Sequence, residues 1–314
     1  MEIFDFELKH VEEAKLIAIS NYNEEREYVK VLPEIYTFPD LEHFANNGLG
    51  VVAFDNGRMV GFLCCYEPWE SAYNSKAKGT FSPIHAHGTV KENRCRVYRK
   101  MYEAAAEKWV KNKITYHSIA LYAHDQEAVN AMFTYGFGLR CIDAIRPMEG
   151  LEIQCNNEVI FEELSKAEIP KVREMRKLLT EHLGHSPCFM YSTQEVFERW
   201  LTRAEARNTR LFVAIDEEKP IAFVEIAGGG ENFATEVPDM CNICGAFCLP
   251  EYRGKNIYQS LLNFTILKLK EEGYNRLGVD FESFNPNANM FWTKYFTSYT
   301  NGVVRRIDEC ALNN

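Results

Sequence analysis

The sequence predicts an α/β (α+β) fold with two domains in tandem, residues 1–150 and 151–314, each a mixed, mostly antiparallel sheet flanked by helices. Two observations lead to this prediction. The chain has 314 residues, a length that favours two domains over one. Three segments also recur in the same order at a nearly constant spacing, so we interpret the chain as two copies of one α/β unit.

The first recurring segment has the pattern of a β-hairpin. The stretches "VVAFDNGRMVGFLCCY" (51–66) and "LFVAIDEEKPIAFVEI" (211–226) each place a polar turn between two runs of β-forming residues. Ala53 lies 161 positions before Ala214, within these two stretches. Each copy is therefore expected to contain a hairpin at this place.

The other two recurring segments have helical patterns. The stretches "RCRVYRKMYEAAAEKWV" and "NIYQSLLNFTILKLKEEG" carry apolar residues at four-residue spacing, and the second is expected to end at Gly273. Their residues Tyr98 and Tyr258 are 160 positions apart. The stretches "DQEAVNAMFTYGF" and "NPNANMFWTKYFT" carry Ala128 and Ala288 at the same spacing.

Each copy is expected to run in the order strand, one or two helices, hairpin, strand, helix, strand, helix, strand. The stretch "RPMEGLEIQCNNE" (146–158), with its Pro, Gly and Asn residues, is the natural joint between the copies. In the second copy the expected strands are 159–164, 210–215, 221–227, 242–249, 276–283 and 303–308. The expected helices are 167–183, 193–206, 257–272 and 286–295.

Composition excludes several classes of protein. The formal charge is −10, the isoelectric point is about 5.4, and no long run of Lys or Arg occurs, so nucleic acid is not an expected partner. No stretch approaches the roughly 18 consecutive apolar residues of a membrane span. The N-terminus "MEIFDFELKHVEE" lacks the pattern of a secretion signal. We therefore expect a cytoplasmic protein without a membrane partner.

The ten cysteines are interpreted as reduced thiols, because they are spread over a long chain without a secretion signal. Cys241 and Cys244 form a CxxC pair with Cys248 nearby, but no His or second pair completes four ligands. His85 and His87 lack a carboxylate or thiol partner and are expected at the surface or on an edge strand. No metal is expected.

The stretch "LPEYRGKNIYQSLL" has the pattern of an anion-binding turn that opens into a helix. Arg253 and Lys255 supply positive charge, and Gly254 between them permits a left-handed backbone angle. Asn256 adopts such an angle at lower cost than most residues. Tyr258 departs from the pattern, because its side chain narrows the approach. The alternative is an ordinary helix start with a basic surface loop.

The matching stretch of the first copy departs further from this pattern. Residues 93–96, Asn-Arg-Cys-Arg, stand where residues 253–256 stand in the second copy, and they contain no glycine. Such a turn is not built for close approach of a phosphate to the backbone. Tyr98 matches Tyr258, so this tyrosine is interpreted as a shared packing residue. We interpret the first copy as a degenerate domain with a structural or acceptor-shaping role.

With its neighbouring motifs, the second copy resembles the GNAT family of acyl-CoA-dependent N-acyltransferases. The resemblance rests on "GAFCLPEYRGKNIYQSLL", "GYNRLGVDF" and "NPNANMFWTKYF", which are similar to the family's strand, its R-G-x-G-x-G/A loop and its N-x-x-A-x-x-x-Y-x-K-x-G-F pattern. It covers residues 240–297 well and 159–308 loosely. The first copy matches over 50–137 through the repeat. The resemblance implies that each domain has a splayed central pair of strands.

By this resemblance the co-substrate is acetyl-CoA, bound in the second copy. Its pyrophosphate would lie on the loop, and a backbone N–H near residues 247–249 would hold the thioester carbonyl. Asn285 matches the family Asn that contacts the coenzyme. The residues expected to bind acetyl-CoA are Phe247, Cys248, Leu249, Arg253, Gly254, Lys255, Asn256, Ile257, Tyr258 and Asn285.

The resemblance also implies direct attack of a neutral amine on the thioester, with a carboxylate helping to remove the amine proton. The candidate bases are Glu225, Asp280 and Glu282, of which the last two share one face of a strand. The family tyrosine that protonates the leaving thiolate is replaced by Trp292, whose indole cannot do so near neutral pH. Tyr295, one helical turn later, is a further candidate donor, and core packing is its other interpretation.

The leading hypothesis is an N-acetyltransferase that moves an acetyl group from acetyl-CoA to a primary amine of a small molecule or peptide. One alternative is a non-catalytic acyl-CoA-binding or interaction protein with degenerate domains. A second alternative keeps the fold with another donor, such as a longer acyl-CoA or an aminoacyl donor. No feature of the sequence names the acceptor or indicates an oligomeric state.

Overall fold

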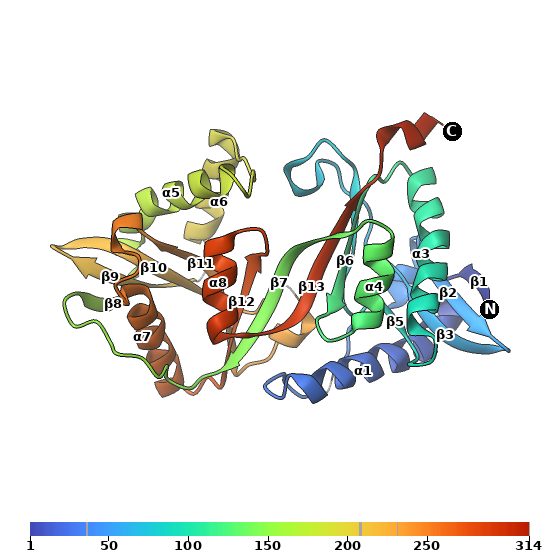
Figure 1. Ribbon diagram of the computed structural model, residues 1–314, viewed down its shortest axis with the longest axis horizontal. Helices are drawn as coiled ribbons and strands as arrows, with labels where there is room; N and C mark the ends of the chain where they lie inside the picture. Colours follow the sequence, from blue (N-terminus) through green and yellow to red (C-terminus); the bar gives the residue numbers. More distant parts are fainter. Residues whose placement is uncertain (36, 207–208, 231, 314) are drawn as a thin grey trace. The chain divides into compact units, whose positions relative to one another are not determined.

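The chain divides into two structural units, whose elements are labelled in Figure 1. The computed structural model describes residues 1–35, 37–206, 209–230 and 232–313. Unit 1 comprises Met1–Asp143 together with Thr297–Asn314, and unit 2 comprises Ala144–Phe296. The repeat assigns the C-terminal segment Thr297–Asn314 to the second copy. In the structure the strand of this segment pairs with a strand of unit 1, so the segment belongs to unit 1.

Unit 2 contains the strands and helices that the sequence predicts for residues 159–295. Its strands are β8 (Ile160–Leu164), β9 (Arg210–Asp216), β10 (Lys219–Gly228), β11 (Met240–Cys248) and β12 (Arg276–Glu282). Its α-helices are α5 (Arg173–Gly184), α6 (Gln194–Ala206), α7 (Ile257–Glu271) and α8 (Pro286–Tyr295). Short 3₁₀ helices η3 (Lys166–Val172), η4 (Phe233–Thr235) and η5 (Pro250–Tyr252) connect them. Gly273, with φ +95°, follows the end of α7 as expected.

The strands of unit 2 form a mixed, mostly antiparallel sheet in the order β12-β11-β10-β9-β8. Strands β8 to β11 pair antiparallel, whereas β11 and β12 pair parallel. The turn between β9 and β10 places Glu217 and Glu218 at positive φ, as a two-residue hairpin turn between twisted strands requires. The predicted hairpin and the predicted fold class are therefore confirmed.

Helices cover both faces of this sheet (Figure 1). Val213 of β9 packs in one core cluster with Met175 of α5. Its neighbour Phe212 points to the opposite face, and its ring centre lies 6.3 Å from that of Phe264 of α7. Helix α8 packs against α7 through aromatic side chains. Side chains of α5 can therefore meet those of α7 and α8 only where the sheet is open.

Unit 1 follows the same order of elements, with additions. Its strands are β1 (Glu2–Asp5), β2 (Val51–Asp55), β3 (Arg58–Leu63), β4 (Gly79–Ser82), β5 (His87–Thr89), β6 (Tyr116–Tyr122), β7 (Gly138–Pro147, which runs on into unit 2) and β13 (Thr297–Arg306). Its helices are η1 (Leu8–His10), α1 (Val11–Tyr28), α2 (Glu42–Asn46), η2 (Ala72–Asn74), α3 (Arg94–Lys111), α4 (Gln126–Thr134) and η6 (Glu309–Asn313). Strands β1-β2-β3-β5 form one antiparallel sheet, and β4, β6, β13 and β7 are neighbours in another.

The last strand begins earlier than the sequence predicts. A strand is expected over 303–308, but β13 begins at Thr297. Its first residues, "TSYTNG", include Asn and Gly, which do not favour strands. Pairing with β6, from Thr300 opposite Tyr122 to Arg306 opposite Tyr116, supplies the backbone partners that local propensity does not indicate. Among the described helices, none is both long and apolar enough to cross a bilayer.

His85, His87 and His117 are among the buried histidines of unit 1. Burial is the main cause that lowers the pKa of each to about 4. The sequence predicts His85 and His87 at the surface or on an edge strand. His87 does lie on β5, at the edge of its sheet, but both side chains are buried, so the prediction of a surface position is wrong. The Nε2–H of His87 donates to the carbonyl of Ala120, and the hydroxyl of Tyr98 donates to its Nδ1. These partners are remote in sequence, so no local pattern indicates the burial.

We expect the free energy of unfolding to fall as the pH is lowered from about 6.5 to about 4. In this pH window these histidines are protonated in the unfolded chain but not in the folded chain. Acid therefore favours the unfolded state by on the order of 1–3 kcal/mol per histidine. Urea midpoints measured by circular dichroism between pH 7.5 and 4.5 check this expectation. His87→Gln should flatten the dependence, whereas His185→Gln, at an exposed position, should not. A midpoint that is independent of pH would contradict it.

Candidate functional site

Two neighbouring strands of unit 2 separate partway along their length. Strands β11 and β12 pair from Met240 opposite Arg276 to Ile243 opposite Val279. Residues 244–248 of β11 and 280–282 of β12 continue as strands past the end of this ladder. The two parallel strands therefore diverge at their C-terminal ends and leave a gap in the sheet.

A bulge in β11 lies where this opening begins. Glu225 of β10 is opposite Gly245, and Ile226 is opposite Ile243, so Cys244 is the extra residue of a bulge in β11. An extra residue in one strand bends that strand and increases its twist. A Cβ at Gly245 would lie 3.0 Å from the Glu225 carboxylate, so glycine permits the close approach of β11 to this side chain.

A buried ion pair lies beside the bulge. Arg176 of α5 donates to Glu225 at 2.8 Å, and the two side chains are 1% and 4% exposed. The guanidinium of Arg176 also lies 5.7 Å from the ring centre of Trp200 in α6. Because a cation already holds the Glu225 carboxylate in the core, Glu225 is not placed as a free general base.

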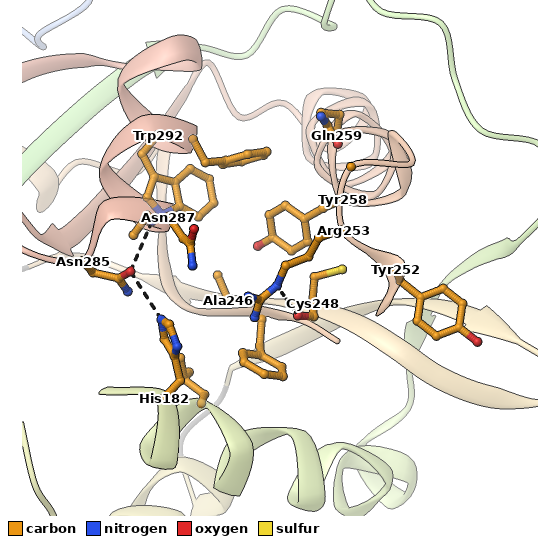
Figure 2. A pocket seen from close by; sticks show the side chains of 15 residues that line it. His182, Ala246, Cys248, Tyr252, Arg253, Tyr258, Gln259, Asn285, Asn287 and Trp292 are labelled. Atoms are coloured by element: carbon orange, nitrogen blue, oxygen red, sulfur yellow. Dashed lines mark hydrogen bonds between the residues drawn. The ribbon is translucent and has the colours of Figure 1, made fainter. Parts of the chain in front are cut away.

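A cavity of about 240 Å³ lies beside the diverging end of β11 (Figure 2). It is bounded by the end of α5, the last residues of β11, the turn at residues 252–254, and the N-terminal parts of α7 and α8. Helices from both faces of the sheet thus contribute side chains to one cavity. This is possible only because β11 and β12 have separated.

The turn at the edge of this cavity has the backbone geometry that the sequence predicts. Gly254 and Asn256 both have left-handed angles, with φ of +77° and +58°. Asn256 is the N-cap of α7, but its side chain makes no capping hydrogen bond. The first N–H groups of α7 are therefore left for another acceptor at the positive end of the helix dipole. Arg253 lines the cavity, and Lys255 extends from the same turn over the ring of Tyr252.

Asn285 and His182 meet across the cavity (Figure 2). Asn285 is the N-cap of α8, and its Oδ1 accepts hydrogen bonds from the backbone N–H of Ala288 and, at 3.4 Å, from Nε2 of His182. This arrangement leaves Nδ1 as the basic nitrogen of a neutral His182 ring. His182 continues the stripe of Met175 and Leu179 on α5 at helical spacing. That position on an otherwise apolar stripe is the only sequence signal for it, and no motif marks it.

Aromatic side chains form the wall contributed by α7 and α8. The buried ring of Trp292 makes edge contacts with the rings of Tyr258 and Phe291. The Tyr258 hydroxyl lies 3.5 Å from the carbonyl oxygen of Phe223 in β10, so the side chain reaches toward the sheet while its ring lines the cavity. Burial raises the pKa of Tyr258 well above its ordinary value. Neither Trp292 nor Tyr258 is therefore suited to release a proton near neutral pH.

The backbone amides of β11 point alternately to its two neighbours. Leu249 donates its N–H to the carbonyl of Ile221, and Phe247 is opposite Phe223 in the same antiparallel ladder. Hydrogen-bonded pairs alternate along such a ladder, so the amide of Phe247 also faces β10. The amide of Cys248, between them, faces the gap. Of the three amides expected near a thioester carbonyl, only that of Cys248 points into the open space.

The structure gathers part of the predicted coenzyme site around this cavity. The predicted residues that line it are Phe247, Cys248, Arg253, Gly254, Tyr258 and Asn285. Those that adjoin the lining along the chain without belonging to it are Leu249, Lys255, Asn256 and Ile257. Trp292 also belongs to the lining, at the position where the family pattern has tyrosine.

The predicted catalytic residues Glu225, Glu282 and Tyr295 lie outside this lining. Glu282 is half-buried on β12, and its charge adds to burial in raising the pKa of Cys188. The ring of Tyr295 lies 5.1 Å from that of Phe291, so packing is its evident role. Asp280 accepts a hydrogen bond from the Asn242 side chain at 3.1 Å.

Unit 1 has different chemistry at the corresponding turn. Helix α3 begins at Arg94, so the residues aligned with 254–256 are already helical. One more helical turn replaces the turn that unit 2 has before α7. The guanidinium of Arg94 is buried and pairs with Glu24 at 2.9 Å and with Asp125 at 3.1 Å. Arg94 is therefore engaged by carboxylates, and the backbone N–H of Cys95 in the first turn of α3 donates to Glu127 at 3.1 Å.

In unit 1, β4 and β5 together stand where unit 2 has β11, and β6 stands where it has β12. Strand β4 pairs parallel with β6, whereas β5 belongs to the other sheet, and His87 of β5 reaches β6 through its 2.6 Å hydrogen bond to Ala120. The ring of Tyr98 lies beside His87 and is fully buried. Packed side chains thus occupy the space between these strands in unit 1.

Comparison with known proteins agrees with this geometry. Residues 172–296 match the model of the acetyltransferase (GNAT) family. A GCN5-related N-acetyltransferase from Sphaerobacter thermophilus has a TM-score of 0.58 at 11% identity, over 93% of this chain and 91% of that chain. A GCN5-related glucosamine N-acetyltransferase region of a fungal multi-domain GH3 beta-N-acetylglucosaminidase has a TM-score of 0.53 at 10% identity, over 96% of this chain and 38% of that chain.

A functionally unknown conserved protein from Staphylococcus epidermidis has a TM-score of 0.50 at 12% identity, over 79% of this chain and 92% of that chain. No curated protein matches the sequence significantly. At these identities the solved structures establish a shared fold, and the family model adds the family of the segment it matches. Residues 172–296 therefore form an acetyltransferase domain of the GNAT family, within a chain that has the GNAT fold.

Proposed function

We propose that this protein is an N-acetyltransferase that binds acetyl-CoA in unit 2 and transfers the acetyl group to a primary amine of a small molecule or peptide. The observation that carries the proposal is the cavity beside the diverging strands, lined from both faces of the sheet and flanked by the uncapped start of α7. Acetyl-CoA combines a pyrophosphate, a narrow pantetheine arm and a thioester. The turn before α7 would bind the pyrophosphate, and the gap between β11 and β12 would hold the pantetheine arm. The backbone N–H of Cys248 would donate to the thioester carbonyl.

Local charge supports the pyrophosphate end of this proposal. The whole chain has a formal charge of −10, yet Arg253 and Lys255 stand together at the turn before α7. The free N–H groups of the first helical turn add hydrogen-bond donors and a favourable dipole. A basic turn on an acidic protein therefore gives an anionic coenzyme one preferred place to bind.

In the proposed reaction the amine nitrogen forms a bond to the thioester carbonyl carbon, and the carbon–sulfur bond breaks. The Cys248 amide donates to the carbonyl oxygen as negative charge develops on it. His182 Nδ1 accepts the proton that the amine loses, and the resulting imidazolium protonates the departing sulfur. Asn285 holds the ring through Nε2. An imidazole ring can accept a proton at one nitrogen and then donate it, so a histidine side chain suits both steps.

We assign proton transfer to His182 because other residues considered for it are less suited. Glu225 is paired with Arg176, Tyr295 packs outside the cavity lining, and Trp292 cannot supply a proton. A non-catalytic acyl-CoA-binding protein is the second candidate function, and Trp292 at the position of the family tyrosine is the observation that favours it. Activity of His182 variants separates the two candidates.

Gly254→Pro should weaken acetyl-CoA binding at least about tenfold, measured by titration calorimetry. Proline fixes φ near −65°, whereas Gly254 has φ +77°. Gly254→Asn is the matched control, because asparagine tolerates left-handed angles and should bind within a few-fold of the original. A Cβ at this position would meet no atom within 4 Å, so the contrast reports backbone conformation. Equal affinity of the Pro and Asn variants would contradict the proposed turn.

His182→Gln should lower thiol release from acetyl-CoA by about 10²- to 10⁴-fold across a panel of primary amines, because the proton acceptor is lost. Acetyl-CoA affinity should change little. His185→Gln, one turn further along at an exposed position, is the control. Tight acetyl-CoA binding by the unaltered protein without thiol release from any amine would favour the non-catalytic candidate. No binding of any acyl-CoA would refute both.

Arg176→Met should lower the free energy of unfolding by about 3–5 kcal/mol, because it leaves the Glu225 carboxylate buried without a cation. The double variant Arg176→Met with Glu225→Gln should recover a large part of this loss, since it removes the buried charge. Urea denaturation of the single and double variants measures both values. A loss below about 1 kcal/mol for the single variant would show that Glu225 is not held by this pair.

A further inference from the structure

Unit 1 contains its own cavity, at the place that corresponds to the cavity of unit 2. It measures about 250 Å³ and is bounded by α1, the start of α3, the end of β6 and the start of α4. These elements correspond in order to α5, α7, β12 and α8. Asp125, the N-cap of α4, lies 160 positions before Asn285, the N-cap of α8. The two cavities therefore occupy matching positions among matching elements.

The charge of the unit 1 cavity is opposite to that of the turn in unit 2. Its lining carries the carboxylates of Glu24, Glu25, Asp125 and Glu127 and the single guanidinium of Arg94. Arg94 donates to the carboxylates of Glu24 and Asp125 and to the backbone carbonyls of Thr89 and Val90. One guanidinium cannot neutralise four carboxylates, so the cavity disfavours an anion such as pyrophosphate and favours a cation.

The carboxylates that do not pair with Arg94 have other partners but keep acceptor capacity. Glu25 accepts from Nδ1 of His124 at 2.8 Å and from its backbone N–H at 3.2 Å. Glu127 accepts from the backbone N–H of Cys95 at 3.1 Å. A carboxylate offers about four lone-pair sites, so these groups can accept further N–H donors from a ligand.

The hydroxyl of Tyr122 is the observation that points to a ligand. Tyr122 lines the cavity and is 5% exposed, and among the described residues its buried hydroxyl has no hydrogen-bond partner. Burial raises the pKa of Tyr122 well above its ordinary value, and the charges of Tyr22 and Glu25 add to the effect. A protonated phenol near a carboxylate, with no partner in the protein, costs about 1–3 kcal/mol unless another molecule satisfies it.

An aromatic pair forms the exposed side of the cavity. The rings of Tyr28 and His124 stack with centres 4.8 Å apart and an angle of 3° between their planes. Such a flat surface packs against methylene groups and attracts an ammonium group through its ring face. Within the described part of the chain, no three His, Cys, Asp or Glu side chains are grouped to hold a metal ion. An organic cation therefore fits this lining better than a metal ion.

We propose that the cavity of unit 1 binds a small organic cation with primary ammonium groups, a polyamine in chemical class, where unit 2 binds its anionic coenzyme. Each ammonium offers three N–H donors. The Tyr122 oxygen accepts one of them, Glu25 and Glu127 accept others, and the methylene chain lies on the Tyr28–His124 pair. This binding does not depend on the acetyl transfer proposed for unit 2.

Titration calorimetry with spermidine, at about 0.15 M salt to suppress nonspecific attraction to the acidic chain, tests this proposal. Saturable binding of one spermidine per chain is expected at this cavity. Tyr122→Phe should weaken it by roughly 3- to 10-fold, the value of one hydrogen bond. The same change should not lower the melting temperature of the unliganded protein, because it removes only an unsatisfied hydroxyl. Glu127→Gln should weaken binding, whereas Glu27→Gln, exposed on α1 outside the cavity, should not.

Two further ligands distinguish a site for ammonium groups from a site for any cation. Choline, which has no N–H donor, and Mg²⁺ should bind much more weakly than spermidine, and equal binding of either would overturn the assignment of an ammonium ligand. Spermidine is also a primary amine that unit 2 could accept as a substrate. Binding that is unchanged in both Tyr122→Phe and Glu127→Gln would place it outside unit 1 and overturn the proposal. So would the absence of saturable binding.

Discussion

The separation of β11 from β12 is the constraint on which the site of unit 2 depends. The ladder between β11 and β12 ends at Ile243 and Val279, so backbone groups of the two strands do not pair with each other beyond this point. Such groups are costly to bury unpaired, and Arg253 satisfies one of them by donating to the carbonyl of Cys248. The gap is consequently a surface of oriented donors and acceptors, and the amide of Cys248 is one of them. It also lets α5 meet α8 across the sheet, which is how His182 comes within reach of Asn285.

The bulge in β11 that accompanies this separation packs against a buried ion pair. Cys244 is the extra residue, and Gly245 lets the strand pass close to the Glu225 carboxylate, which Arg176 secures from α5. A buried charge pair contributes little net stability but makes alternative packings costly, because either charge alone would be stranded in the core. We therefore infer that the Arg176–Glu225 pair fixes the shape of β11. The proposed site uses the backbone amides of β11 and not the carboxylate of Glu225.

Features set by neighbouring residues were predictable from the sequence, and features set by distant partners were not. The strands and helices of unit 2 follow from periodicity and turns, and the left-handed angles of Gly254 and Asn256 follow from residue type. The engagement of Glu225 depends on a partner 49 positions away in the chain, and the contact of His182 with Asn285 spans 103 positions. No local pattern reports either contact, so the sequence alone predicts neither the ion pair of Glu225 nor the place of His182 at the cavity.

The two units show how little change converts one kind of cavity into another on the same order of elements. The sequence of unit 1 lacks the glycine, and α3 starts one turn earlier than α7, with the backbone N–H of Cys95 donating to Glu127. A helical start brings Arg94 inward, where a buried guanidinium requires carboxylates, and Glu24 and Asp125 supply them. Once carboxylates line that cavity, an anion is disfavoured there. The carboxylates around Arg94 thus account for the proposed reversal of charge preference, without any change in the order of strands and helices.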